Sequence, residues 1–363
     1  MIVTVTANPA LDLTWHVEKI VAGGTHRADA GAARAGGKGL NVARVAHAQG
    51  ASVVAVTTTG GATGAEFTAE LIVAGVPHML VPVAAATRRS IALVDEALGD
   101  TTIVNERGIA PASDEWDALR AAVADALAHT SGPPADAGAP VLVISGSFPP
   151  GTPDEVLPSL IALGREAGAT VIADTSGPAL LVAADAGASV LKPNEHELAD
   201  ATGLDDPIEG ARELLRRGAE LVLLSRGAEG MLAITAADPG APASDAPAHA
   251  YERGADTPHV GRSPASGPTS GVSAPETYRP HMPVSVLHAR LDTALAGNPT
   301  GAGDAAVAAC AVLMDAGIHD PEQILRRATS WSAAAVLMPL AGEIHPTWPD
   351  LERALVLTPK ETR

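Results

Sequence analysis

Residues 141–174 read VLVISGSFPPGTPDEVLPSLIALGREAGATVIAD. Two short apolar runs, 141–144 and 171–173, flank a longer segment at 153–167 whose apolar residues have helical spacing. Short β-branched runs bounded by Gly, Pro or Asp are typical of buried parallel strands. The stretch therefore predicts one strand, helix and strand unit of an α/β fold.

The same alternation continues on both sides of this unit. Further strands are expected at 2–6, 53–56 and 221–224, and further helices at 38–49, 65–74, 114–128, 196–202 and 207–217. Alternation of this kind specifies a mainly parallel sheet covered on both faces. After Leu232 the alternation stops, and three helical stretches at 303–316, 321–338 and 348–355 close a single domain over residues 1–363.

Two regions depart from this pattern. Residues 11–35 and 87–104 hold short strand-like runs with little helix between them, which predicts a small accessory β-sheet acting as a lid. Residues 236–284 are rich in Pro, Ala, Ser and Gly, so we expect a flexible insertion there. A sheet with one open face commonly pairs with its copy, which favours a homodimer through the lid.

The composition excludes several classes of protein. The formal net charge is −18, with 24 Lys and Arg against 42 Asp and Glu, which argues against a nucleic-acid partner. The single cysteine, Cys310, cannot form an internal disulfide, which favours the cytoplasm. The longest apolar runs are too short for a membrane span, and no basic segment of a signal peptide precedes the first strand. We expect a soluble cytoplasmic protein.

The clearest chemical signal is GNPTGAGDAAVAA at 297–309, where a turn of small residues runs directly into a helix. Gly301 and Gly303 allow a ligand to approach the backbone, and amide groups at a helix start bind anions. Asp304 is placed to accept a proton from an attacking hydroxyl, although with an ordinary pKa of about 3.9 it would be a weak base. An acidic residue that only caps the helix explains the local pattern equally well.

A second glycine turn, GGKGLNVAR at 36–44, also opens a helix. It is not a Walker A loop, because Ala32 stands where that motif requires Gly and Gly39 where it requires Ser or Thr. Bare backbone with the Asn41 amide could bind sugar hydroxyls. A glycine turn with a solvated lysine remains the simpler interpretation of this segment alone.

Together, and in this order, the two segments resemble the signatures of the PfkB (ribokinase-like) carbohydrate kinases. Further segments are similar to landmarks of the phosphosugar branch of that family: NPALD at 8–12, TR at 87–88, SGSFPPG at 145–151, DTSG at 174–177, KPNEHE at 192–197 and SRG at 225–227. The resemblance implies a ribokinase-like three-layer α/β fold with a central, mainly parallel sheet. It also implies a kinase with ATP as co-substrate and Mg²⁺.

The resemblance implies roles for individual residues. Asp304 would be the general base, and the amides of Gly301, Ala302 and Gly303 would hold the transferring phosphoryl group. Substrate binding falls to Asp12, Arg27, Gly36, Gly37, Lys38, Asn41, Arg88, Ser147 and Asp304. Nucleotide binding falls to Lys192, Asn194, Ser225, Gly227, Gly301 and Gly303, and magnesium binding to Asn194 and Glu197, partly through water.

The expected reaction is phosphorylation of a phosphorylated ketohexose by ATP, with fructose 1-phosphate to fructose 1,6-bisphosphate as the first choice. Arg27 and Arg88 favour a substrate that already carries a phosphate, since arginine binds phosphate through two parallel hydrogen bonds. Tagatose 6-phosphate, fructose 6-phosphate, a plain hexose or ribose would suit the same machinery. A sugar-phosphate sensor without catalysis is the alternative outside enzymes. A Rossmann oxidoreductase is disfavoured because no GxGxxG follows the first strand.

Overall fold

The computed structural model describes residues 1–129, 139–237 and 282–359. The insertion predicted at 236–284 therefore lies almost wholly outside the described residues. Within the described part of the chain, no helix is both long and apolar enough to cross a membrane.

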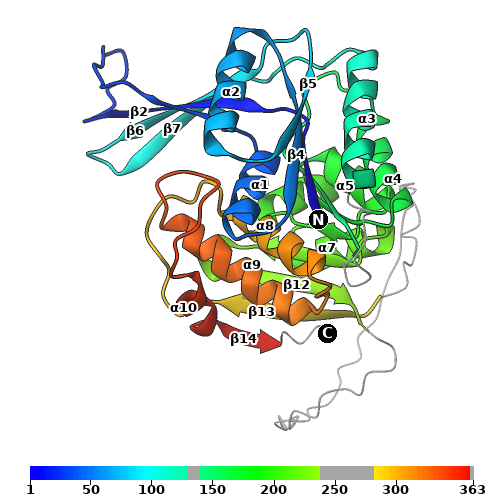
Figure 1. Ribbon diagram of the computed structural model, residues 1–363. Helices are drawn as coiled ribbons and strands as arrows, with labels where there is room; N and C mark the ends of the chain where they lie inside the picture. The colour runs from blue at the N-terminus through cyan, green and yellow to red at the C-terminus, as the bar shows by residue number, and fades with distance from the viewer. Residues whose placement is uncertain (130–138, 238–281, 360–363) are drawn as a thin grey trace, which may run out of the picture.

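A ten-stranded sheet forms the centre of the molecule (Figure 1). Its strands run, in spatial order, β5 (His78–Pro82), β4 (Val53–Thr59), β1 (Ile2–Thr6), β8 (Val141–Ser145), β9 (Thr170–Asp174), β10 (Val190–Leu191), β11 (Leu221–Ser225), β12 (Met231–Ala236), β13 (Val284–Arg290) and β14 (Val356–Pro359). From β5 to β11 neighbouring strands pair in parallel, and β11 to β14 pair antiparallel. The mainly parallel sheet predicted from the alternation is confirmed.

The sequence pattern did not predict the last three strands of the sheet. Antiparallel β12, β13 and β14 extend the sheet at one side. β13 and β14 each lie next to chain segments without the strand and helix alternation, so the pattern that reveals parallel strands does not mark them. Pairing with β12 places Val284 opposite Ala236, so the chain leaves the described residues and returns at adjacent positions.

Helices cover both faces of the main sheet. One layer holds α1 (Lys38–Ala48), α2 (Gly61–Ala74), α8 (Ala302–Asp315), α9 (Pro321–Val336) and α10 (Trp348–Arg353). The other holds α3 (Ser113–His129), α4 (Val156–Glu166), α5 (Pro178–Asp185), α6 (Glu195–Thr202) and α7 (Pro207–Arg217). Successive strand residues face opposite layers: Ile2 joins the first apolar cluster and Val3 the second. The result is the three-layer α/β fold.

A separate four-stranded sheet, in the order β3 (Ala32–Gly36), β2 (Ala10–Val17), β6 (Arg88–Asp95) and β7 (Asp100–Asn105), projects away from the main body (Figure 1). These strands fall in the two segments that depart from the alternation. β2 follows β1 almost directly, and β3 leads into the glycine turn before α1. The base of the small sheet is therefore tied to the ends of the main strands.

Candidate active site

A cavity of about 900 Å³ lies at the carboxyl ends of the parallel strands, where ligands of open α/β sheets bind. It also reaches the base of the small sheet. Most of the predicted site residues line it: Asp12, Gly37, Lys38, Asn41, Arg88, Lys192, Asn194, Glu197, Ser225, Gly227, Gly301, Ala302, Gly303 and Asp304. Its volume is at the upper end of the usual range for small-molecule sites, so it has room for two substrates.

Three predicted residues do not line the cavity. Gly36 lies against Asp12, where an added Cβ would stand 1.9 Å from Oδ2, so any other residue at position 36 would displace that carboxylate. Arg27 is exposed in the segment between β2 and β3. Ser147 is exposed as well, and its hydroxyl accepts a hydrogen bond from Asn8 Nδ2 at 3.3 Å. Among the described residues, neither Arg27 nor Ser147 forms a hydrogen bond or ion pair with another predicted site residue.

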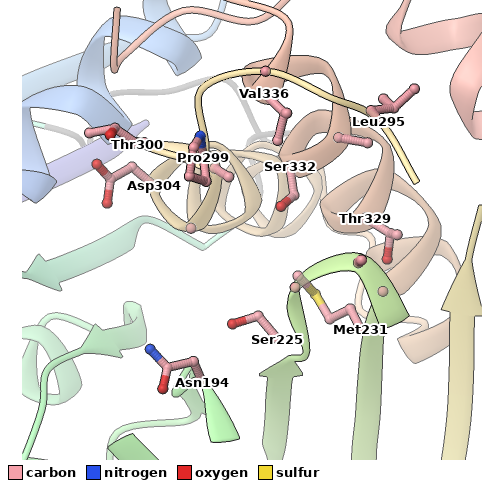
Figure 2. Close-up of a pocket in the computed structure, with 18 of the residues that line it drawn as sticks. Asn194, Ser225, Met231, Leu295, Pro299, Thr300, Asp304, Thr329, Ser332 and Val336 are labelled. Atoms are coloured by element: carbon pink, nitrogen blue, oxygen red, sulfur yellow. The ribbon is translucent and has the colours of Figure 1, made fainter. Parts of the chain in front are cut away.

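The turn at 301–304 brings Asp304 to one end of the cavity (Figure 2). Gly301 is the N-cap of α8 with φ +84°, a backbone conformation that favours glycine. Asp304 lies inside the helix and makes no capping hydrogen bond. Its side chain is buried, and Oδ2 accepts a hydrogen bond from Asn41 Nδ2 at 2.8 Å. The interpretation of Asp304 as a simple helix cap does not agree with this geometry.

Burial raises the pKa of Asp304 to about 6, and the negative charge of Asp174 adds to the effect, while Lys38, Asn41 and Lys192 oppose it. The expectation of an ordinary aspartate pKa is therefore wrong. A carboxylate with this pKa is still mostly ionised at pH 7, and it is a stronger base than an exposed aspartate. The site thus holds a buried carboxylate suited to accept a proton.

Asp174, at the end of β9, is fully buried and lies between Lys38 and Lys192, two lysines that line the cavity. Lys38 Nζ and Lys192 Nζ stand 3.4 and 3.5 Å from its oxygens, and the Ser145 hydroxyl donates to it at 3.0 Å. Burial alone would raise the pKa of Asp174, but both lysines and the hydroxyl hold it below its ordinary value. The sequence reasoning gave Asp174 no role. Its position directly after a predicted buried strand was the available signal.

Asn194 and Glu197, the predicted magnesium residues, form a capping box at the start of α6. The Asn194 side chain accepts from the Glu197 amide at 2.8 Å, and Glu197 Oε2 accepts from the Asn194 amide at 2.9 Å. Glu197 Oε1 is not part of the box and stands 3.8 Å from Lys38 Nζ. Both residues therefore have a structural role and also line the cavity.

The end of the cavity away from Asp304 is partly apolar, with Met231, Leu295 and Val336 among its lining residues. Figure 2 shows Met231, Thr329 and Ser332 well away from Asp304, with Ser225 and Asn194 below them. The sequence reasoning missed Met231 and Thr329, because nothing in their local pattern separates them from core residues. This end fits a flat, partly apolar group such as a nucleobase.

The end of the cavity next to the small sheet carries two charged side chains, those of Arg88 and Asp12. Arg88, the first residue of β6, donates from Nε to the Asn8 carbonyl at 3.2 Å and from Nη1 to the Glu106 carbonyl at 3.1 Å. Burial raises the pKa of Asp12 to about 6, although Arg88, Ser90 and Arg34 oppose the rise. Asp12 and Arg88 thus face the same cavity as Asp304.

The sequence model of the pfkB family carbohydrate kinases matches residues 5–250 of the chain. The chain belongs to the pfkB family of carbohydrate kinases. It is a phosphotransferase with the ribokinase-like fold. The family match ends before the 301–304 turn.

Named proteins resemble this PfkB kinase in sequence. It is 39% identical over 240 residues to a 1-phosphofructokinase of Xanthomonas campestris, covering 63% of this chain and 72% of that one. It is also 39% identical over 242 residues to a 1-phosphofructokinase of Haloferax volcanii, covering 65% and 73%. An ATP-dependent 6-phosphofructokinase isozyme 2 of Mycobacterium tuberculosis is 35% identical over 242 residues, covering 64% and 68%.

Solved structures extend the likeness to nearly the whole PfkB kinase. The tetrameric inhibited form of phosphofructokinase-2 from Escherichia coli superposes with a TM-score of 0.75 at 25% identity, covering 97% of this chain and 98% of that one. A ribokinase of Arabidopsis thaliana complexed with ribose and ATP gives a TM-score of 0.63 at 19% identity, covering 97% and 98%. At that identity the second likeness shows the fold alone.

Proposed function

We propose that this PfkB kinase transfers the γ-phosphoryl group of ATP to fructose 1-phosphate, giving fructose 1,6-bisphosphate. The observation that carries the proposal is that one cavity holds the buried carboxylate of Asp304 and the guanidinium of Arg88. The first group suits proton abstraction and the second suits a phosphate already on the acceptor. The names of the Xanthomonas and Haloferax relatives support the same substrate.

In this proposal the acceptor hydroxyl lies beside Asp304, and its oxygen attacks the γ-phosphorus in line. Asp304 takes the proton as the new phosphorus–oxygen bond forms and the bond to the β-phosphate oxygen breaks. The backbone amides at the start of α8 stabilise the charge on the transferring group. Lys192 Nζ adds a positive charge there, since an added Cβ on Gly303 would lie 3.2 Å from it.

Arg88 binds the acceptor's own phosphate in this proposal. Two backbone carbonyls hold its Nε and Nη1, which fixes the plane of the guanidinium. A guanidinium carries five N–H donors, so others remain for a ligand. A fixed orientation lowers the entropy lost when the phosphate binds.

Magnesium would be held by Glu197 and, through water, Asn194. The residues fit this ion: Oε1 of Glu197 lies outside the capping box, and oxygen ligands are those that Mg²⁺ prefers. Among the described residues no group of three or more acidic, His or Cys side chains forms a cage. Mg²⁺ in kinases is bound by one or two carboxylates together with substrate phosphates, and when bound it neutralises charge on them.

Fructose 6-phosphate is the second candidate acceptor. The Mycobacterium relatives carry the name 6-phosphofructokinase isozyme 2, and the Escherichia coli phosphofructokinase-2 has been solved in complex with fructose-6-phosphate. Both acceptors present a ketohexose with one phosphate and one free terminal hydroxyl. Arg88 and Asp304 therefore suit either compound.

A coupled assay of ADP release tests the proposal. Fructose 1-phosphate, fructose 6-phosphate, tagatose 6-phosphate, fructose and ribose are compared at matched concentrations with Mg²⁺ and ATP. The expected result is the highest kcat/KM for fructose 1-phosphate and a much lower value for the two sugars without phosphate. A higher value for either 6-phosphate rejects the first choice, and a higher value for fructose or ribose rejects the phosphosugar class.

We further propose that two copies of the chain pair through the small sheet. Strand β7 at its edge exposes Ile103 and Val104, with 47% and 56% of their surface accessible. Exposed apolar residues on a free sheet edge favour pairing with a second chain. Sedimentation equilibrium is expected to give a dimer for the native protein and a larger monomer fraction for Ile103→Glu. An unchanged mass distribution would argue against this interface.

A further inference from the structure

A second guanidinium, that of Arg34, lies beside the acceptor end of the cavity. Arg34 is on β3, where it is the register partner of Asp12 on β2. Its Nη1 stands 3.0 Å from Oε1 of Glu343, and 18% of its side chain is exposed. Within residues 1–129, 139–237 and 282–359, no other ion pair joins a strand of the small sheet to the C-terminal part of the chain.

Glu343 ends a segment, residues 339–343, that packs on the catalytic turn. Asn298 Nδ2 donates to the Pro339 carbonyl at 3.0 Å. A Cβ added to Gly301 would lie 2.8 Å from the Cα of Ala341, so the two backbones are in contact there. Movement of the segment would therefore move the turn that carries the phosphate-binding amides.

Residues 339–343 also contact Asn41, the hydrogen-bond donor to Asp304. A Cβ added to Gly342 would lie 3.1 Å from Oδ1 of Asn41, whose Nδ2 donates to Asp304. Glu343 directly follows Gly342 in the chain. The ion pair thus reaches from the small sheet, through one peptide, to the partner of the catalytic carboxylate.

A second cavity of about 370 Å³ separates the small sheet from this segment. Arg34 and Glu343 both line it, and it shares Asp12, Asn41 and Thr300 with the main cavity. The ion pair therefore spans an open space next to the acceptor end of the site. The small sheet and α8 also share one apolar cluster, which includes Leu11, Ala35 and Ala305, so the ion pair adds a polar link to that packing.

We propose that Arg34 and Glu343 are positioning residues whose ion pair couples the seating of the acceptor on the small sheet to the alignment of the 301–304 turn. An acceptor that contacts Asp12 shifts β2 and its partner β3, and Arg34 transmits that position to Glu343. Only when both are in place do the base and the phosphate-binding amides meet the acceptor hydroxyl. The inference rests on the proposed function, because it needs an acceptor sugar at Asp12.

A double-mutant cycle tests the coupling. Arg34→Met and Glu343→Gln are each expected to lower kcat about 10-fold, with the KM for ATP changed less than about 3-fold, because misalignment affects the transfer step. The double variant is expected to lose about 10-fold as well, rather than about 100-fold, since the second change acts on an ion pair that is already broken. Arg34→Lys retains the charge and is expected to recover most of the lost kcat.

The ion pair of Arg327 and Glu352 provides the matched control. Its atoms stand 2.6 Å apart, its side chains are 25% and 24% exposed, and it joins α9 to α10. Arg327→Met and Glu352→Gln are expected to lower Tm while kcat stays within about 2-fold, the effect of a purely structural pair. The inference is overturned if the kcat losses of Arg34→Met and Glu343→Gln multiply in the double variant. It is also overturned if those losses equal the ones of the control pair.

The cycle is measured with whichever sugar in the acceptor panel is turned over fastest. If that sugar is not fructose 1-phosphate, the proposed substrate is wrong, but the ratio of single to double variants still reports the coupling. If fructose 1-phosphate is the best acceptor and the effects multiply, the coupling alone is wrong. The two failures are thereby distinguished.

Discussion

Two buried carboxylates, Asp304 in the cavity and Asp174 behind the lysines that line it, have opposite pKa shifts. Asp304, at the start of α8, has a pKa raised to about 6, whereas Asp174, at the end of β9, has a pKa below its ordinary value. Burial acts in the same direction on both. The difference lies in the partners: Asp174 is held between the ammonium groups of Lys38 and Lys192, and Asp304 receives its hydrogen bond from the neutral amide of Asn41.

The comparison separates two roles. A carboxylate whose charge is stabilised by two cations is a poor proton acceptor, but it fixes the positions of those cations. A carboxylate with a raised pKa accepts a proton readily near neutral pH. In the proposed function, Asp304 accepts the proton and Asp174 holds the two lysines in place.

The largest effect is expected from Asp304→Asn, which removes the proposed proton acceptor of the two carboxylates. The amide keeps the shape but cannot accept the proton, so kcat should fall about 10²- to 10⁴-fold. Binding of ATP and of the sugar phosphate, measured by calorimetry, should change only a few-fold. If kcat stays near the native value, Asp304 is not the base.

The next largest effect is expected from Asp174→Asn, which removes the carboxylate that lies between Lys38 and Lys192. Removal of one member of a buried ion pair typically costs about 3 kcal/mol, so denaturant unfolding should show a loss of that order. The loss of a negative charge also lowers the pKa of Asp304. The acid limb of kcat should therefore move to lower pH, and a shift to higher pH would contradict the electrostatic account.

Arg88→Ala concerns a third carboxylate of the site, that of Asp12. Burial raises the pKa of Asp12, and the positive charge of Arg88 lowers it in part. Loss of a charge-assisted contact of about 1.5 to 3 kcal/mol should reduce kcat/KM for fructose 1-phosphate roughly 10- to 150-fold. The KM for ATP should barely move, and Arg88→Lys should recover only part of the loss. Fructose is the control substrate, and an equal loss with fructose shows that Arg88 does not bind the phosphate.

A smaller effect is expected from Asn41→Ala, which removes the neutral partner of Asp304. This hydrogen bond favours the ionised carboxylate and so lowers its pKa. Without it the pKa rises, and since the ionised form is the base, the acid limb of kcat should move to higher pH, opposite to the shift in Asp174→Asn. If the acid limb of kcat moves in the same direction in both variants, that limb does not reflect the ionisation of Asp304.

The smallest effect is expected far from both carboxylates. Ala237 N donates to the Pro283 carbonyl at 3.0 Å, so a short hairpin turn can join β12 to β13. Replacing about forty residues between these positions with such a turn changes the loop-closure entropy only slightly. Native kcat/KM and a Tm within a few degrees are expected. A large fall in kcat/KM with native stability would assign the insertion a part in the site.

Local sequence was sufficient for much of the fold and of the site. The strand and helix alternation predicted the parallel part of the sheet, since a strand buried on both faces reads as a continuous apolar run. The turn before α8 was equally readable, because only glycine adopts the φ of +84° found at Gly301 without strain. By contrast, the antiparallel strands β13 and β14 were missed, because long-range pairing creates them and no local period marks them.

The electrostatic surroundings of the site residues could be identified only from the tertiary structure. Asn41 and Asp304 are 263 positions apart, yet burial, the nearby charge of Asp174 and the hydrogen bond from Asn41 together set the pKa of Asp304. The sequence showed that an aspartate follows the glycine turn, and it could not show which cations or amides that aspartate meets. Interaction between charges depends on distance and burial, and both are properties of the folded chain. For the same reason, only the fold revealed that Arg34 pairs with Glu343.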